Sequence, residues 1–175
     1  RGLTQAIQGE LRSGNYDLLH SHGYSSGVLG YKASWGKDLP HLMTAHDVFR
    51  RDQFQGPKGK LKWAGLNWVY SRLNGILTVG EDCQSNFERY MPLVPRRRIT
   101  NIDHGVDTQR FASAEPRDFR RELNVPPQTP LIGFFGRFMA QKGFIDIVHA
   151  MKHLAQSLPE ERMPRVLTFG WGGFV

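Results

Sequence analysis

Short apolar runs alternate along this chain with longer segments in which apolar residues recur every three or four positions. The first such segment carries Leu3, Ile7 and Leu11, and after Gly14 it gives way to the apolar run 17–21. Recurrence every three or four positions is typical of helices, and short apolar runs are typical of strands. Their repeated alternation favours parallel strands joined by crossover helices. The pattern therefore predicts an α/β fold.

The same pattern continues to the end of the chain. Further strands are predicted at the apolar runs 42–45, 76–79, 99–102, 131–135 and 166–169. Helices are predicted over 25–35, from Trp63 to Leu73, from Glu81 to the residues before Pro92, and from Phe144 to Leu158. The stretch 47–59 is rich in charge and turn residues and is predicted as a loop.

A proline-rich stretch divides the chain. Pro116, Pro126, Pro127 and Pro130 surround the short charged segment 117–123, which predicts a linker at 113–130 between a first domain at 1–112 and a second at 131–175. After the linker the pattern supplies only two strands and one helix. Because so small a unit has too little core to stand alone, the second domain is expected to be incomplete.

Composition restricts the class of protein. Hydrophobic residues make up 39% of the 175 residues, which excludes a disordered or collagen-like chain. A single cysteine, Cys83, cannot form an intrachain disulfide and fits a reducing, cytoplasmic setting. No apolar stretch approaches the roughly 20 residues that a membrane-spanning helix needs. We therefore expect neither a signal peptide nor a transmembrane helix.

The chain is basic, with a formal net charge of +7, which favours polyanionic partners such as nucleic acid, anionic lipid or diphosphates. The basic residues form three clusters, at 50–51, 58–62 and 96–98. Such clusters are usually solvated faces, and attachment to an anionic membrane surface is the main functional alternative. A nucleic-acid-binding module is a second alternative, but no recognition motif accompanies the charge.

The segment 136–143 (GRFMAQKG) carries the clearest chemistry. It follows a predicted strand and leads into a predicted helix, and ligands of parallel α/β sheets bind beyond the carboxyl ends of strands. Gly136 would let the backbone approach a phosphate closely, while Arg137 and Lys142 could neutralise a diphosphate from two directions. The alternative is an ordinary surface Arg and Lys beside a tight turn.

Four histidines offer a competing interpretation. His20, His22, His46 and His104 lie at or near predicted strand ends, where imidazoles can converge on a metal ion of a hydrolase. His20 and His22 share one face of a strand, but no Asp or Glu accompanies them at a recognisable ligand spacing. We therefore expect no metal site, and we expect His20 to be a buried, hydrogen-bonded core residue.

Several ordered motifs resemble glycosyltransferase family 4. The segment 136–143 is similar to the Gly-Arg…Lys-Gly loop that opens the family's C-terminal domain, and His104-Gly105-Val106-Asp107 with Phe111 is similar to its Asn-Gly-Val-Asp…Phe signature. The segments 17–23 (DLLHSHG), 44–47 (TAHD) and 76–82 (ILTVGED) resemble the family's acceptor-domain strands in the right order. The resemblance covers nearly the whole chain. His104 and Gly80 depart from the family's usual Asn and Ser.

The resemblance implies a GT-B fold of two Rossmann-like domains, here the end of the N-terminal acceptor-side domain and the start of the C-terminal donor-binding domain, both incomplete. It implies transfer of a sugar from a nucleotide-diphosphate sugar to an acceptor, with retention and without a metal or other cofactor. Arg137 and Lys142, with Gly136 and Gly105, would bind the donor and stabilise the departing diphosphate.

By the same resemblance, His46 would contact the transferred sugar or its acceptor, and His22 and Tyr24 would line the acceptor side. The acceptor is expected to be a sugar, a lipid-linked or a small molecule, and polysaccharide acceptors stay open. The basic clusters leave peripheral association at the inner, anionic membrane face as an option, and no nucleic-acid partner is expected. The family's N-terminal glycine-rich loop and later Glu-x7-Glu motif are absent, so the fragment alone is expected to be inactive. A nucleotide-sugar epimerase or phosphorylase on the same fold is the remaining alternative.

Overall fold

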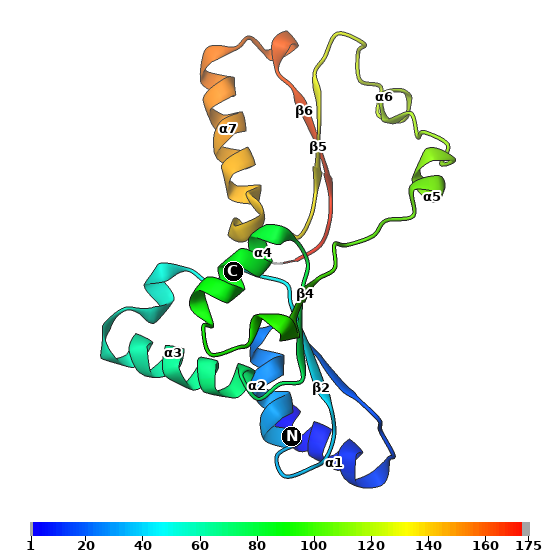
Figure 1. Cartoon of the computed structure of the whole chain (residues 1–175). Coiled ribbons are helices and arrows are strands. Elements are labelled where there is room, and N and C mark those ends of the chain that lie inside the picture. The colour runs from blue at the N-terminus through cyan, green and yellow to red at the C-terminus, as the bar shows by residue number, and fades with distance from the viewer. Residues whose placement is uncertain (1, 173–175) are drawn as a thin grey trace. The chain divides into compact units, whose positions relative to one another are not determined.

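The computed structural model describes residues 2–172 and divides into two compact units. Unit 1 comprises Arg1–Asp107 and unit 2 comprises Thr108–Val175. In Figure 1, unit 1 runs from blue to green and unit 2 from green to red. The stretch predicted as a linker falls in unit 2, where it contains the short helix α6 (Phe119–Glu122).

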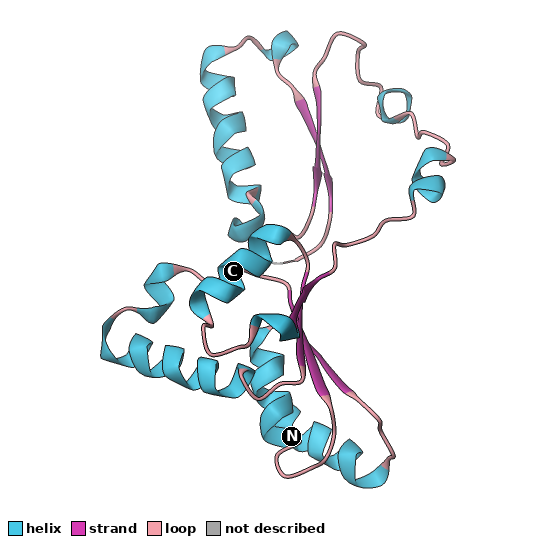
Figure 2. Cartoon of the chain, viewed as in Figure 1, coloured by secondary structure: helices cyan, strands magenta, loops and turns pink. Residues whose placement is uncertain are grey.

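Unit 1 contains a parallel four-stranded sheet with the strands in chain order, β1-β2-β3-β4. The strands are β1 (Leu19–His22), β2 (His41–Ala45), β3 (Gly75–Thr78) and β4 (Ile99–Asn101). The helices are α1 (Leu3–Ser13), α2 (Tyr24–Ala33), α3 (Gly56–Tyr70) and α4 (Glu81–Tyr90), with 3-10 turns η1 (Arg51–Phe54) and η2 (Arg96–Arg98). Figure 2 shows the alternation of strand and helix that the sequence predicts for a parallel sheet.

The core of unit 1 lies between one face of this sheet and α2, α3 and α4. Met43 of β2 pairs with Ile76 of β3, which pairs with Ile99 of β4, so these buried side chains form one row across the sheet. The ring of Tyr70 from α3 lies 5.9 Å from that of Phe87 from α4, and both residues are fully buried. Full burial of each such side chain stabilises the fold by roughly 1.5–3 kcal/mol.

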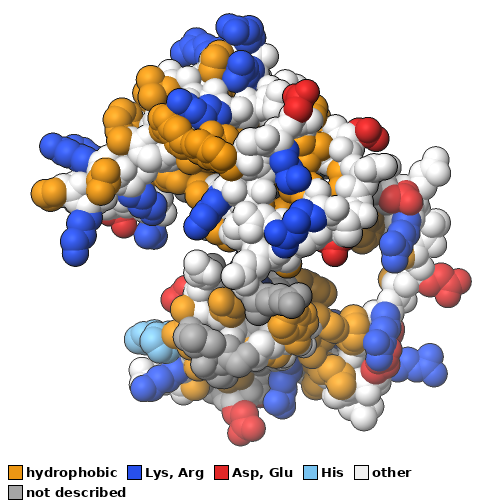
Figure 3. All heavy atoms as spheres, turned by 90° about the horizontal axis from the view of Figure 1, so that it is seen from below, with side chains coloured by type: hydrophobic (Ala, Val, Ile, Leu, Met, Phe, Trp, Pro, Cys, Tyr) orange, Lys and Arg blue, Asp and Glu red, His pale blue; other side chains and the backbone are white. Residues whose placement is uncertain are grey.

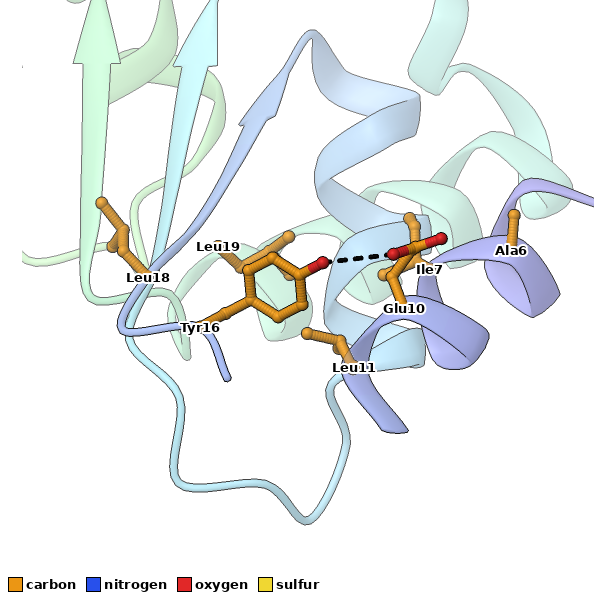
Figure 4. Close-up of a pocket in the computed structure, with 7 residues that line it drawn as sticks. All are labelled: Ala6, Ile7, Glu10, Leu11, Tyr16, Leu18 and Leu19. Carbon is orange, nitrogen blue, oxygen red and sulfur yellow. Dashed lines mark hydrogen bonds between the residues drawn. The ribbon is translucent and has the colours of Figure 1, made fainter. Parts of the chain in front are cut away.

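The edge strand β1 is accompanied by α1. Tyr16 lies between α1 and β1 and donates its hydroxyl hydrogen bond to Glu10 Oε2 at 3.1 Å, as Figure 4 shows. A mostly apolar cavity of about 300 Å³ opens there, lined by Ala6, Ile7, Glu10, Leu11, Tyr16, Leu18 and Leu19. Gly14 ends α1, as its place in the sequence predicts.

Unit 2 contains a parallel two-stranded sheet, β5 (Leu131–Phe135) and β6 (Arg165–Phe169), with α7 (Phe144–Ser157) connecting the strands. Phe134 is buried and its ring lies 5.3 Å from that of Phe144 at the start of α7. The ring of Phe135 points to the other face of the sheet, where it stacks on Phe169 and is 75% exposed. The remaining elements are α5 (Thr108–Ala112), α6, η3 (Ala140–Lys142) and η4 (Glu160–Arg162).

Three details of the predicted elements are wrong. The stretch 47–59 is not all loop, because it contains η1 and the first residues of α3. Leu73 lies beyond the end of α3, although it is buried with the helix residues. Trp35 lies beyond α2, which ends at Ala33. Among residues 2–172, no helix is both long and apolar enough to cross a membrane.

Candidate functional site

Four histidines gather towards the carboxyl edge of the unit 1 sheet, two within a strand and two beyond strand ends. His20 and His22 belong to β1, His46 follows β2, and His104 follows β4, and we call these four residues the histidine cluster. They meet because parallel strands end at one edge of a sheet. His20, His22 and Thr44 alternate with the core residues along their strands, so they lie on the face away from α2, α3 and α4.

The imidazole rings of the cluster are in direct contact. His22 Nδ1 and His46 Nε2 share a hydrogen bond of 3.0 Å, and the ring of His104 stacks on that of His46 at a centroid distance of 5.7 Å. The rings of His20 and His22 lie 4.4 Å apart. One of the two bonded nitrogens must carry the shared proton, and the other accepts it.

His20 differs from its expected role. Its Nε2 hydrogen-bonds to Thr44 Oγ1 at 2.8 Å, but the residue is exposed, so the prediction of a buried core histidine is wrong on burial. The physical reason is its place on the face of the sheet away from the three core helices. Partial desolvation, followed by the charges of His22 and His46, lowers the pKa of His20. The neutral form of His20 is therefore favoured.

Within residues 2–172, no three His, Cys, Asp or Glu side chains are arranged to hold a metal ion. Two of the closest histidine nitrogens instead bond to each other. The histidine cluster thus presents hydrogen-bonding imidazoles rather than a ligand set around a common point.

Tyr24 is held away from the open edge. Its ring stacks on Phe49 with centroids 4.0 Å apart, and its hydroxyl donates to the carbonyl of Asp47 at 2.6 Å. Burial raises the pKa of Tyr24, so the phenol stays neutral. The ring lines a cavity of about 410 Å³, which we call the aromatic cavity, with Ser25, Val28, Leu29, Phe49, Gln53, Lys62, Leu66 and Tyr70.

The segment after β2 is fixed by residues that the sequence did not single out. Asn86 of α4 accepts a hydrogen bond from Phe49 N at 2.7 Å and donates one to Phe49 O at 3.0 Å. Cys83 Sγ lies 3.4 Å from the carbonyl oxygens of both Ala45 and Asp47. These contacts connect the segment around His46 and the wall of the aromatic cavity to α4. No sequence pattern marks Asn86 for this role.

In unit 2, the segment 136–143 joins β5 to α7, and we call it the cationic loop. Gly136 N donates to Phe169 O at 3.0 Å, and Phe138 N donates to Trp171 O at 3.2 Å, so the loop is bonded to the chain that follows β6. A Cβ on Gly170 would overlap the carbonyl group of Gly136, so only a glycine at position 170 allows the two segments to approach this closely. Gly143, at φ 76°, turns the loop into the N-terminus of α7.

Arg137 and Lys142 lie on this loop and are exposed. A Cβ on Gly136 would lie 3.9 Å from Lys142 Cβ. The side chain of Lys142 therefore begins close to Gly136, the residue before Arg137. Within residues 2–172, neither cation pairs with a carboxylate. Free cations next to the start of a 14-residue helix are suited to an anion.

The predicted site residues thus fall into two groups. His22 and His46 lie together with His104 in unit 1, and Gly105 follows His104 in an exposed segment without regular structure. Gly136, Arg137 and Lys142 lie together in unit 2. Tyr24 is next to the first group in the chain, but it faces the aromatic cavity. The role of each residue in binding or catalysis stays a prediction.

The parallel α/β units are Rossmann-like and belong to the GT-B class of fold. The sequence profile of Glycosyltransferase Family 4 matches residues 2–110, more than half of the chain. The chain belongs to this family, as its motifs suggest.

Curated relatives agree with this assignment. The chain is 27% identical over 141 residues to the alpha-maltose-1-phosphate synthase of Mycobacterium tuberculosis, covering 76% of this chain and 36% of that protein. It is 27% identical over 154 residues to D-inositol 3-phosphate glycosyltransferase 2 of Catenulispora acidiphila, covering 85% and 36%. For the D-inositol 3-phosphate glycosyltransferase of Xylanimonas cellulosilytica the identity is 28%, covering 85% and 37%. The chain spans little more than a third of the length of these relatives.

Proposed function

We propose that the full-length protein transfers a sugar from a nucleotide-diphosphate sugar to the hydroxyl group of an acceptor, with retention. Membership of Glycosyltransferase Family 4 supports the reaction class. Among the relatives, one is named as a synthase of a maltose phosphate and another as a glycosyltransferase of an inositol phosphate. In this reaction the bond between the anomeric carbon and the diphosphate oxygen breaks, and its electron pair leaves with the diphosphate. The acceptor oxygen bonds to the anomeric carbon, and its proton passes to an oxygen of the departing diphosphate.

The cationic loop carries this proposal. Negative charge grows on the diphosphate as the bond breaks, and Arg137 and Lys142 are free to meet it from one loop. Fixed donors placed where charge develops lower the barrier, because they need no reorganisation during the reaction. Charged hydrogen bonds of this kind are worth roughly 1.5–3 kcal/mol each. We propose that no metal ion is required, since the two cations supply the neutralisation.

Replacing Arg137 or Lys142 by Ala in the full-length protein tests the donor site. We expect each variant to lose at least tenfold in turnover, or about 1.4 kcal/mol of transition-state stabilisation. The assay measures sugar transfer and donor hydrolysis from a panel of nucleotide sugars, with EDTA present. Arg162→Ala and Lys152→Ala are matched controls, because both residues are exposed in unit 2 outside the loop. Unchanged kinetics in both loop variants would refute the assignment.

On the acceptor side, we propose that His46 contacts the transferred sugar or the reacting hydroxyl group and that His22 orients it. The 3.0 Å hydrogen bond between the two rings supports this, since it fixes which nitrogen of His46 stays available. The adjoining aromatic cavity offers mostly apolar walls, with Lys62 as its cation. An acceptor with an anionic group and a less polar body, whether sugar, lipid-linked or small molecule, fits this environment.

His46→Ala should therefore reduce transfer more than it reduces donor binding. We expect at least a tenfold lower rate of transfer, with nucleotide affinity within threefold of the parent value, because the donor's cations lie in unit 2. Transfer kinetics and nucleotide titrations on the full-length protein measure the two effects. His149→Ala, an exposed histidine of α7, is the control. Equal losses in transfer and nucleotide binding would contradict a role on the acceptor side.

A further inference from the structure

An aromatic surface lies at the edge of unit 1 opposite the histidine cluster. Trp35 follows α2, Trp68 lies near the end of α3, and their rings stack with centroids 5.6 Å apart at 22°. Tyr31 meets both indoles edge-on, and the Arg72 guanidinium lies 3.9 Å from the centre of the Trp68 ring. We call these four residues the tryptophan platform. None of these four residues belongs to the transfer site proposed above.

Trp35 is the open member of the platform. Trp35 is 64% exposed, whereas Trp68 is 39% exposed. Arg72 also donates from Nη1 to the Trp68 carbonyl at 3.0 Å, which holds the guanidinium in place. Because ring contacts and this hydrogen bond already order the platform, a ligand would lose little affinity to the ordering of side chains.

A cavity of about 290 Å³ adjoins Trp35, at the lower end of the range for ligand pockets. Its lining is mostly polar and comprises Tyr31, Ser34, Trp35, Gly36, Lys37, Asp38, Leu39, Pro40, His41, Arg72 and Asn74. Asn74 Oδ1 accepts from His41 N at 2.9 Å, which leaves its amide N–H groups available. Asp38 supplies a carboxylate acceptor, and Arg72 supplies further donors.

This combination matches the chemistry of a sugar ring. A pyranose has faces of C–H groups that pack on an indole and a rim of hydroxyl groups that need donors and acceptors at close range. The cavity provides an indole face together with a carboxylate, an amide and a guanidinium. A lipid surface fits less well, because Asp38 would face anionic headgroups. Nucleic acid fits less well for the same reason, and Lys37 Nζ already donates to the carbonyl of Leu11 at 3.2 Å.

The position of the platform separates it from the transfer site. His41 begins β2 and lines this cavity, whereas Ala45 ends β2 next to His46. Four steps of about 3.3 Å along the strand place the two ends roughly 13 Å apart. We propose that the tryptophan platform and the cavity beside it form an accessory glycan-binding site, which holds a neutral oligosaccharide or polysaccharide away from the reacting groups.

Affinity electrophoresis of the full-length protein tests this site. One native gel contains glycogen, a second contains a soluble mixed-linkage β-glucan, and a third contains no glycan. We expect retardation in at least one glycan gel, and we expect Trp35→Ala to raise the apparent Kd at least tenfold. Trp35→Phe should retain most of the binding, and Asp38→Asn should weaken it by threefold or more. Trp171→Ala is the residue-matched control, because Trp171 is 74% exposed and belongs to unit 2.

Donor hydrolysis by the same Trp35→Ala protein should equal that of the parent, which separates this site from the proposed transfer reaction. If the parent protein shows no transfer activity at all, the proposed function is refuted, and the result of the gel experiment still stands. No retardation of the parent in either glycan gel would overturn the inference. Equal retardation of Trp35→Ala and parent would overturn it too, as would Trp35-dependent binding to anionic vesicles without binding to glycan.

Discussion

At the scale of single residues, His41 has the most unusual environment. It is 3% exposed at the start of β2, and its Nε2 shares a hydrogen bond of 2.8 Å with Ser21 Oγ. Its Nδ1 has no hydrogen-bond partner within residues 2–172. Desolvation, with a smaller effect from the charge of His20, lowers the pKa of His41 to about 4. The ring is therefore neutral in the folded protein near pH 7, and its protonation opposes folding.

This burial predicts a loss of stability in mild acid. The unfolded chain takes up the His41 proton near its ordinary pKa of about 6.5, whereas the folded chain takes it up only near pH 4. Stability is then fully present above pH 6.5 and falls as the pH drops towards 4, by up to about 3 kcal/mol. Urea midpoints of the full-length protein between pH 7.5 and 4 measure the slope.

His41→Gln is the informative variant, because it removes the titrating group but keeps a polar side chain. It should flatten the dependence of the urea midpoint on pH over this window, even if the variant is less stable at pH 7.5. His149→Gln, which replaces an exposed residue of α7, should keep the slope of the parent protein. A slope that is the same in His41→Gln and the parent would show that another group controls the acid sensitivity.

At the scale of elements, hydrophobic periodicity was enough to place the strands. The five runs predicted after residue 40 overlap β2 to β6, because each strand is a short apolar run between turn residues. The start of α3 was missed because Gly56-Pro57-Lys58-Gly59 has the composition of a loop. Pro57 is tolerated in the first turn, where its missing N–H has no partner. Gly59 is required by packing, since a Cβ there would lie 2.9 Å from Phe54 Cα.

Contacts between elements account for what the sequence could not provide. The positions of His22, His46 and His104 in the chain indicate that they follow strands, but only the register of the sheet brings their rings together. The exposure of His20 follows from which face of the sheet the core helices cover, and that choice depends on residues far away in the chain. The role of Asn86 could not be predicted for the same reason, because its hydrogen-bond partner Phe49 lies 37 positions earlier in the chain.

At the scale of the whole molecule, the two units differ in how much apolar surface they bury. Unit 1 has a continuous cluster of buried residues that includes Met43, Tyr70, Ile76 and Phe87. In the described part of unit 2, Phe134 is the only buried aromatic or aliphatic side chain besides Pro164, while Phe135 and Val148 are 75% and 49% exposed. Orange hydrophobic side chains are visible among the charged ones on the face of the molecule drawn in Figure 3.

This difference predicts unequal local stability in the 175-residue chain. Opening a segment exposes the apolar surface that it buries, so a segment with little burial opens at low cost. We expect amide hydrogen exchange in β5 and β6 to be at least 100-fold faster than in β2 and β3, each corrected for intrinsic rates. The part of each relative that this chain matches is only 36% of that relative's length. In the full-length protein we therefore expect β5 and β6 to become protected. Mass spectrometry measures the exchange rates in both proteins, with β2 and β3 as the internal reference. Equal protection of the two sheets in the 175-residue chain would contradict the prediction.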